Sequence, residues 1–221
     1  MVVEVNGQQR CGLSSSLRGE HTHGEPAIPQ AGELEQLTAL ELAALAYSDT
    51  LIQASIGVAA VNALLPQQPE RWEDINAEEV IARAGEGKSV GLIGHFPFIP
   101  RLRQRVAELV VIEKQPQPGE HPAEAAMDIL PMMDVVAITG TAMINHTIDH
   151  LLAACKQEAV VVVLGPSTFL SPIMFGYGVD LLCGSVVVDI PAVLEMIRQG
   201  GNFRQVHQAG VRLVSMKKPV A

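Results

Sequence analysis

The sequence predicts an α/β protein, in which a doubly wound, mostly parallel sheet follows a small α+β unit. Two observations predict this class. From Ser89 onward, short β-branched runs without polar alternation are separated by segments of helical length, which is typical of strands buried on both faces and joined by crossover helices. Before that point, a hairpin signal is followed by two alanine-rich helical segments. We therefore expect a cap over residues 1–70 and a sheet domain over residues 71–221.

Composition limits the classes of partner. The chain has 221 residues, 48% of them hydrophobic and 18% charged, which is ample for a folded core. Its net charge of -9 argues against a nucleic-acid or anionic-membrane surface, because neutralising phosphates requires clustered Lys and Arg. No apolar run reaches the roughly 18 residues of a membrane span, and the cysteines stand far apart without a C-x-x-C pair. We expect a cytoplasmic protein with no nucleic-acid or membrane partner.

The cap begins with the hairpin signal. Residues 2–5 and 8–17 flank Asn6-Gly7, the pair that best tolerates the positive φ angles of a tight primed turn. A polar loop over residues 18–33 precedes two apolar helical segments, residues 37–47 and 50–65. Two short strands bury little surface, so we expect both helices to pack against the sheet domain as well.

The sheet domain supplies the remaining elements. Its predicted strands cover residues 89–94, 108–113, 134–139, 159–165 and 183–188, with a last strand near residues 211–218. Its predicted helices cover residues 97–108, 122–131, 142–156 and 171–179. Arg101, Arg103 and Arg105 form the densest basic group, and we expect them on a solvated helix face.

Ligands of such sheets bind beyond the carboxyl ends of the strands, where successive crossovers part to opposite faces. The predicted ligand-binding residues follow those ends. They are His95, Phe96, Pro97, Glu113, Thr139, Gly140, Thr141, Asn145, Pro166, Ser167 and Thr168.

Structural roles compete with ligand binding at several of these positions. His95 could cap the next helix or bond a carbonyl, and Glu113 could pair with an arginine across the sheet. The serines and threonines are also typical of turns and helix N-caps, and Asp189 is expected to be an N-cap. Ser167 lacks the G-x-S-x-G elbow of a hydrolase nucleophile.

The sequence contains only one of the two marks of a dinucleotide-binding site: the acid is present, but the glycine-rich turn is not. The first turn reads GLIGHFPFIP, so His95, Phe96 and Pro97 stand where bare glycine backbone should approach a pyrophosphate. Glu113 does follow at the distance typical of a ribose-binding acid. An adenosyl ligand, which needs only the acid, therefore fits better than NAD or FAD.

Two histidine pairs have ligand-like spacing. On a continuous helix over residues 142–156, His146 and His150 lie opposite the apolar stripe. The glutamate of a zinc-protease motif is absent. We therefore expect both histidines to lie on the solvated surface of the helix. His21 and His23 lie in the polar loop, where the spacing is more often fortuitous. No metal ligand is assigned from the residues; if a metal binds, the His95 end of the cleft is preferred.

Three segments of the sheet domain resemble one known family. They are VGLIGHFPFIPRL, LVVIEKQPQPGEHPAEAAMDILPMMDVVAITGT and VVVLGPSTFLSPIMFGYGVDLLCGSVVVD, and in the cap CGLSSSLRG and ASIGVAAVNALLP fit the same family. The likeness is to the "putative heavy-metal chelation" family, domain of unknown function 364. It implies an enolase-N-terminal-like cap on a Rossmann-like domain, with the ligand cleft between them. Members carry more chain before the hairpin, so either the cap lacks an element or its start lies upstream.

Three functional hypotheses follow. The first is a cleft that binds a small polar molecule, a transition metal or a metal chelate, for metal handling or cofactor maturation. The second is an enzyme acting on an adenosyl or similar nucleotide ligand, with Glu113 on the ribose. The third is a non-catalytic interaction module whose apolar cap helices form a homo-oligomer. The sequence does not decide whether a reaction is catalysed.

Overall fold

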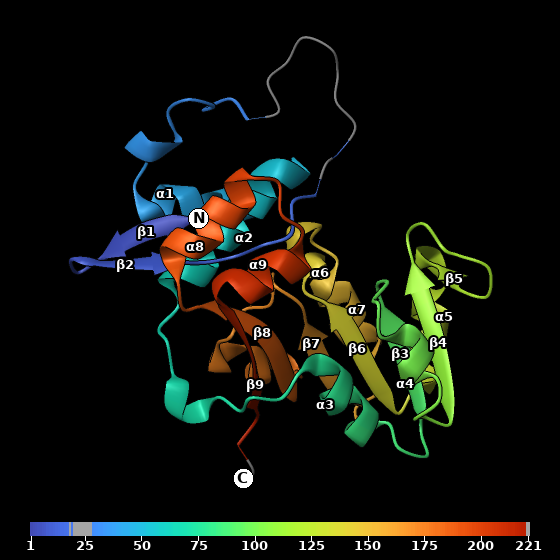
Figure 1. Cartoon of the computed structure of the whole chain (residues 1–221). Coiled ribbons are helices and arrows are strands. Elements are labelled where there is room, and N and C mark those ends of the chain that lie inside the picture. Colours follow the sequence, from blue (N-terminus) through green and yellow to red (C-terminus); the bar gives the residue numbers. More distant parts are fainter. Residues whose placement is uncertain (18, 20–27, 220–221) are drawn as a thin grey trace.

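The computed structural model of the chain describes residues 1–17, 19 and 28–219. A seven-stranded sheet forms its centre, in the order β5-β4-β3-β6-β7-β8-β9 (Figure 1). The strands are β3 (Ser89–Ile93), β4 (Glu108–Glu113), β5 (His121–Pro122), β6 (Val135–Thr139), β7 (Val160–Leu164), β8 (Leu181–Val187) and β9 (Val211–Lys217). All neighbouring strands run parallel except β8 and β9. The predicted α/β class with a mostly parallel sheet is therefore confirmed.

Helices cover both faces of this sheet. The α-helices of the sheet domain are α3 (Ala77–Ala84), α4 (Ile99–Leu102), α5 (Ala126–Ile129), α6 (Thr141–Ile144), α7 (Ile148–Ala154), α8 (Ile190–Arg198) and α9 (Phe203–Gly210). Val135 and Ala137 of β6 pack in the cluster formed with α3 and α4, whereas Val136 and Ile138 pack in the cluster formed with α5, α6 and α7. Because alternate residues of β6 are buried on opposite faces, the strand has no polar face to show in the sequence.

The order of the strands fixes where the crossovers part. β4 pairs with one edge of β3, and β6, which comes later in the chain, pairs with the other edge of β3. The parting point therefore lies between the carboxyl ends of β3 and β6, which end at Ile93 and Thr139. This is the place where open α/β sheets bind ligands.

The cap consists of a hairpin and two helices. Its strands are β1 (Val2–Val5) and β2 (Gln8–Cys11), and Asn6 and Gly7 have the positive φ angles of 52° and 74° that the sequence predicts. Its helices are α1 (Ala39–Ala44) and α2 (Leu51–Leu64). A Cβ on Gly12 would lie 2.1 Å from the Ala59 carbonyl oxygen, so the chain after the hairpin touches α2 backbone to backbone.

The cap packs against the sheet domain, as predicted. Ala54 and Val58 of α2 belong to the same buried cluster as the sheet, and α2 contacts α6. On its other side Leu13 packs with Val193 of α8 and Val206 of α9. Figure 1 shows α8 beside the hairpin at the end of the molecule that holds the N-terminus. The cap therefore has no separate core.

Four predicted helices are shorter than expected or broken. The segment over residues 97–108 is helical only in α4, and residues 122–131 combine the short α5 with the 3-10 turns η4 (Ala123–Ala125) and η5 (Leu130–Met132). The segment over residues 171–179 is the 3-10 helix η6 (Pro172–Tyr177), which Gly178 ends at a φ of 90°. Residues 142–156 form two helices, α6 and α7. Proline occupies one of the first two positions of α4, η5 and η6, where its missing N–H is tolerated, so it marks where these elements begin and does not account for their early ends.

The remaining 3-10 turns lie in or next to the cap. They are η1 (Leu34–Gln36), η2 (Leu45–Tyr47) and η3 (Pro69–Arg71). The predicted helix over residues 37–47 is therefore α1 followed by η2, whereas the helix over residues 50–65 matches α2 closely. Among the described residues, no helix combines the length and the apolarity needed to cross a bilayer.

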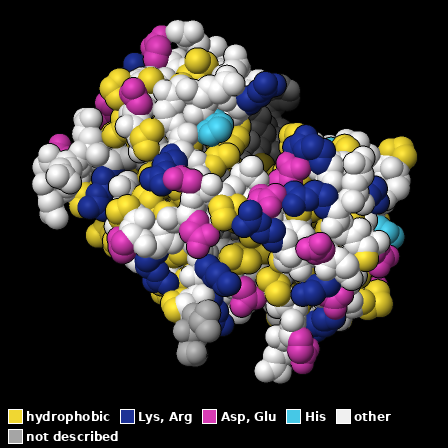
Figure 2. All heavy atoms as spheres, turned by 60° about the horizontal axis from the view of Figure 1, so that its bottom comes forward, with side chains coloured by type: hydrophobic (Ala, Val, Ile, Leu, Met, Phe, Trp, Pro, Cys, Tyr) yellow, Lys and Arg dark blue, Asp and Glu magenta, His cyan; other side chains and the backbone are white. Residues whose placement is uncertain are grey.

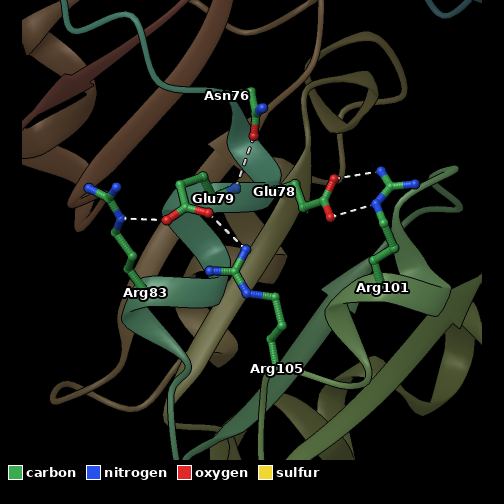
Figure 3. Close-up of polar contacts among 6 residues, drawn as sticks. All are labelled: Asn76, Glu78, Glu79, Arg83, Arg101 and Arg105. Carbon is green, nitrogen blue, oxygen red and sulfur yellow. Dashed lines mark hydrogen bonds and ion pairs between the residues drawn. The ribbon is translucent and has the colours of Figure 1, made fainter.

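Two arginines of the basic group near α4 pair with acidic residues of α3, while Arg103 donates to the Leu109 carbonyl. Arg101 donates two hydrogen bonds to Glu78 at 2.8 and 2.6 Å, and Arg105 donates to Glu79 at 2.8 Å (Figure 3). Glu79 also accepts from Arg83, and these two arginine bonds lower its pKa from 4.5 to about 2. The arginines are exposed as predicted, but the expectation of one shared helix face is wrong because α4 ends at Leu102.

The same mixing of charges extends over a whole face of the molecule. Basic and acidic side chains stand next to one another across the face drawn in Figure 2, rather than gathering into a field of one sign. Such pairing screens each charge locally and leaves little long-range attraction for a polyanion.

Asp134 joins the amino ends of two strands. Its carboxylate accepts hydrogen bonds from Lys156 at 2.7 Å and from the backbone N–H and hydroxyl of Ser89 at 3.1 and 2.9 Å. The bond from Lys156, followed by the two from Ser89, lowers the pKa of Asp134 from 3.8 to about 2. The carboxylate thus holds the start of β6 beside the start of β3.

We expect Asp134→Asn to reduce the acid sensitivity of the fold. The unfolded chain binds this proton more tightly than the folded chain does, so the stabilisation is complete above about pH 4 and is lost as the pH falls towards 2. Urea unfolding of the wild type from pH 5 to pH 2 should show a steeper loss of stability than the variant shows. The control is Asp49→Asn, at an exposed position in the cap. Parallel wild-type and Asp134→Asn curves would contradict the prediction.

Candidate functional site

A cavity of about 780 Å³ lies at the carboxyl ends of the parallel strands. The loops after β3, β4, β6 and β7 line it from the sheet side, and Ser15, Leu17 and Leu51 line it from the cap. Ala126 of α5 and Leu151 of α7 add apolar wall. The cavity is therefore closed by parts of the chain that are far apart in sequence.

Nine of the predicted ligand-binding residues line this cavity. They are His95, Phe96, Glu113, Thr139, Gly140, Thr141, Asn145, Pro166 and Ser167. Pro97 and Thr168 are not among the residues that line it. Lining a cavity does not by itself test a role in ligand binding, so these roles remain predictions.

His95 and Glu120 form a hydrogen-bonded pair at the cavity. Nδ1 of His95 lies 2.8 Å from Oε1 of Glu120, whose side chain is only 6% exposed, whereas that of His95 is 42% exposed. The other carboxylate oxygen accepts a hydrogen bond from the backbone N–H of Gln117 at 2.8 Å. That backbone bond, and then the bond to His95, lower the pKa of Glu120.

The carboxylate fixes the tautomer of the imidazole. With Glu120 ionised, Nδ1 of His95 carries the proton and donates it, so Nε2 of the neutral ring keeps its lone pair. His95 therefore neither caps α4 nor bonds a carbonyl, which were its two structural alternatives. Sequence reasoning missed Glu120 as a partner, although it belongs to the GEHP segment that fits the family; only the fold brings residues 95 and 120 together.

Ser167 ties the sheet domain to the cap. It is 1% exposed, and its hydroxyl accepts a hydrogen bond from the backbone N–H of Ser15 at 2.9 Å and lies 3.3 Å from the Ser14 hydroxyl. Beside it, Nδ2 of Asn62 donates to the Leu13 carbonyl at 2.9 Å. Ser167 thus holds the cap segment that closes the cavity, and its hydroxyl is already engaged there.

The other strand ends contribute polar groups to the cavity. Oε1 of Glu113 accepts from the backbone N–H of Lys114 at 2.6 Å, not from an arginine across the sheet. The hydroxyls of Thr139 and Thr141 lie 3.0 Å apart. Asp189 is an N-cap, as predicted, because its carboxylate accepts from the backbone N–H of Ala192 at 3.0 Å at the start of α8.

The break between α6 and α7 changes the position predicted for His150. His146 has a left-handed φ of 58°, and the N–H of Thr147 bonds the Ala142 carbonyl five residues back as well as Oδ1 of Asn145. The side chain of Asn145 competes with the helical hydrogen bonds, which ends α6. As a result Asn145, Thr147 and His150 all line the cavity.

The prediction of solvated surface holds for both histidines, because both are exposed, but His150 also lines the cavity, so its predicted position on the far side of the helix is wrong. His146 is exposed as predicted, but its Nε2 donates to the Ser48 carbonyl of the cap at 3.0 Å. The error came from treating residues 142–156 as one helix with a constant turn of 100° per residue. The second pair, His21 and His23, lies outside the described residues.

Phe96 occupies the turn that a dinucleotide phosphate would need. Its ring stacks on Phe98 with centroids 5.1 Å apart and planes 15° from parallel. The turn is thereby filled by side chains, whereas a pyrophosphate site requires bare backbone N–H groups at a helix N-terminus. The geometry agrees with the incomplete glycine signature in the sequence.

The described residues do not form a metal centre of their own. No three His, Cys, Asp or Glu side chains of the described ranges come close enough to hold one ion. Burial raises the pKa of Cys155 to about 11 and that of Cys183 to about 12, and it also raises that of Cys11. Thiols in this state are protonated at neutral pH, whereas a soft metal is bound by thiolate. A heavy metal chelated by protein ligands alone therefore does not fit this part of the chain.

Gly140 brings the loop after β6 against the loop after β7 at the cavity. A Cβ there would lie 2.7 Å from the backbone N of Thr168 and 2.9 Å from the carbonyl carbon of Ser167. Its own N–H donates to the Leu164 carbonyl at 2.6 Å. Only glycine allows the loop after β6 to lie this close to the loop after β7.

We expect Gly140→Ala to destabilise the protein, because the added methyl group must push one loop away from the other. Overpacking of this kind costs about 1–3 kcal/mol. Chemical denaturation should show this loss, and Gly176→Ala should show little change because a Cβ there meets no atom within 4 Å. A Gly140→Ala protein as stable as the wild type would show that the loops can separate freely.

Comparisons with known proteins agree with this architecture. Residues 76–216 match the model of the family DUF364, and residues 1–65 match that of DUF4213; both are described as "Putative heavy-metal chelation". An uncharacterized protein of Methanocaldococcus jannaschii is 25% identical over 203 residues, which cover 88% of this chain and 76% of that protein.

Two solved structures of DUF364 proteins with unknown function are similar in fold. That from Desulfitobacterium hafniense is 30% identical with a TM-score of 0.78, covering 90% of this chain and 83% of its own. That from Pyrococcus horikoshii is 23% identical with a TM-score of 0.82, covering 98% of this chain and 87% of its own. Because the DUF364 model spans more than half of the sequence, the chain belongs to the family described as "Putative heavy-metal chelation".

Proposed function

We propose that the chain binds a small polar organic molecule, or a metal chelate that brings its own donor atoms, in the cavity between the cap and the sheet. The observation that carries this proposal is the His95–Glu120 pair at the cavity wall. It supplies one imidazole nitrogen with a fixed lone pair, on a side chain that remains accessible.

The arrangement suits a metal that arrives already chelated. Histidines that bind metals usually donate their second ring N–H to a carboxylate, which orients the ring and raises the basicity of the ligating nitrogen. Glu120 supplies such a carboxylate to His95. Since the described residues bring no three ligands together, the other coordination positions would be filled by the chelator.

The size and character of the cavity support a small ligand. Its volume of about 780 Å³ lies within the range of small-molecule sites, which is roughly 300–1,000 Å³. Leu17, Ile112 and Leu151 provide apolar wall, while the threonines after β6 and the side chains at the α6–α7 break provide polar groups. An amphipathic molecule would bury its apolar part and hydrogen-bond at its edge.

One observation supports a second candidate, an adenosyl or related nucleoside ligand. Glu113 ends β4, the strand that follows β3, and is one of the residues that line the cavity. In nucleotide-binding α/β sheets an acid at this position holds the ribose hydroxyls. Since Phe96 fills the phosphate turn, the ligand would have to lack a pyrophosphate.

The first test uses nickel(II) nitrilotriacetate, a chelate with coordination positions left open. We expect it to bind the wild-type protein in calorimetry, and we expect His95→Ala to abolish the site. Glu120→Gln, which removes the charge behind the ring, should weaken binding about 10-fold to 100-fold.

The matched control is His207→Ala, because His207 lies in α9 and not among the residues that line the cavity. It should bind the chelate as the wild type does. Equal binding by wild type and His95→Ala would contradict the assignment of His95 as the anchoring ligand.

The nucleoside candidate is tested by thermal shift with adenosine and S-adenosylmethionine. A ligand at 100 times its dissociation constant stabilises by about 2.7 kcal/mol, which gives a measurable rise in melting temperature. If the candidate is right, Glu113→Gln should lose this rise while Glu108→Gln, at the exposed start of the same strand, should keep it. No shift with either compound in the wild type would count against a nucleoside.

A further inference from the structure

The end of β6 and the short helix α6 contribute a group of hydrogen-bonding side chains to the cavity wall. They are Thr139, Thr141 and Asn145, and we call them the donor patch. The backbone N–H of Asn145 bonds the Thr141 carbonyl at 3.1 Å, which is the helical spacing that puts both side chains on one side of α6. Which of their polar atoms are free decides what the patch can bind.

The side-chain amide of Asn145 has a defined orientation. Its Oδ1 accepts hydrogen bonds from the backbone N–H of Thr147 at 3.3 Å and from the Thr147 hydroxyl at 2.6 Å. A backbone N–H can only donate, so the amide atom that it contacts must be the oxygen. Nδ2 has no partner among the described residues, and it is not one of the polar atoms that are buried without a partner. The NH2 group of Asn145 is therefore accessible, and it can only donate.

The two threonines add one more free donor. Their hydroxyl oxygens lie 3.0 Å apart, so one hydroxyl donates to the other, and the proton of the second is left over. Oγ1 of Thr139 also accepts from the backbone N–H of Thr141 at 3.3 Å. No other hydrogen bond engages these hydroxyls among the described residues. The donor patch thus offers the NH2 group of Asn145 and one hydroxyl proton.

The donor patch lies beside the His95 turn and away from the acid of the cavity. A Cβ on Gly94, the residue before His95, would lie 3.1 Å from the Cβ of Thr139. Among the described residues that line the cavity, Glu113 is the only acid, and it ends β4, which β3 separates from β6. A negatively charged group at the donor patch therefore meets donors and no carboxylate on its own strand or the next helix.

The chain holds this arrangement at a conformational cost. His146, the residue after Asn145, has a φ of 58°, which is uncommon for a residue other than glycine. Its Nε2 donates to the Ser48 carbonyl of the cap at 3.0 Å, so the cap stabilises the turn that ends α6. Strained residues of this kind cluster at ligand sites, where they orient a neighbouring group. Here the neighbouring group is the amide of Asn145.

We infer that the ligand of the cavity carries a carboxylate, which the donor patch binds, and that Asn145 selects for it. This inference rests on the proposed function, because it requires the ligand to lie in the cavity. A carboxylate accepts without donating, and its charge-assisted hydrogen bonds are roughly twice as strong as neutral ones. An amine at the same place would meet the N–H groups of Asn145 donor to donor. For a metal chelate, the metal would lie on His95 and a carboxylate of the chelator on the donor patch.

Asn145→Asp tests the selection with two chelates of nickel(II). Aspartate keeps an oxygen for the Thr147 N–H and hydroxyl, but it replaces the donor by an anionic oxygen that repels a carboxylate. Nitrilotriacetate carries carboxylates, whereas diethylenetriamine binds the metal through amines alone. In calorimetry we expect the variant to bind the nitrilotriacetate complex about 10-fold to 100-fold more weakly than the wild type does. It should bind the diethylenetriamine complex at least as tightly as the wild type does.

Asn202→Asp is the matched control, because it makes the same change of charge away from the cavity. Asn202 is the N-cap of α9 and is not among the residues that line the cavity, and aspartate caps a helix equally well. Both affinities should equal those of the wild type. Equal losses for the two chelates in Asn145→Asp, or no loss for either, would overturn the inference. The proposed function would still stand if His95→Ala abolished binding, whereas a wild type that binds neither chelate would overturn both.

A measurement on the wild type serves if Asn145→Asp does not fold. The NH2 group of Asn145 gives its own pair of signals in a nitrogen-15 NMR spectrum, and zinc(II) replaces nickel(II) because it is diamagnetic. Zinc nitrilotriacetate should shift this pair, and zinc diethylenetriamine should leave it in place. A pair that stays in place while zinc nitrilotriacetate binds would refute the contact between Asn145 and a carboxylate.

Discussion

The close approach of the loops after β6 and β7 is the constraint on which the rest of the site depends. Gly140 lies against the backbone of Ser167 and Thr168 at distances that leave no room for a Cβ. This contact puts the Ser167 hydroxyl where Ser15 of the cap can donate to it. The cap segment that lines the cavity is thus held by a residue that the sheet has already fixed, in keeping with a cap that has no separate core.

The family description and the site chemistry point to different kinds of metal binding. A protein that chelates a heavy metal by itself gathers several soft or anionic ligands, yet the described residues bring no three together, and partial or full burial raises the pKa of the thiols. What the cavity does offer is one oriented imidazole, His95, backed by Glu120. That arrangement is consistent with the recognition of a complex whose other ligands come from elsewhere.

The sequence was informative where a pattern is local. Buried parallel strands show themselves as unbroken β-branched runs, so all five predicted parallel strands and the final antiparallel one are present. Asn6-Gly7 and Asp189 behave as their types predict, because a primed turn and an N-cap depend only on neighbouring backbone. Helices were less predictable, since periodicity does not reveal that the side chain of Asn145 ends α6 after one turn.

By itself, then, the sequence determined the fold class and the set of loops that meet at the carboxyl edge, because hydrophobic patterning and strand order leave few alternatives. Only the tertiary structure decided which side chains act there and how. It paired His95 with Glu120, engaged Ser167 with the cap and turned His150 towards the cavity. These relations join residues that are distant in the chain or lie across a helix break, and their geometry depends on packing that no local pattern records.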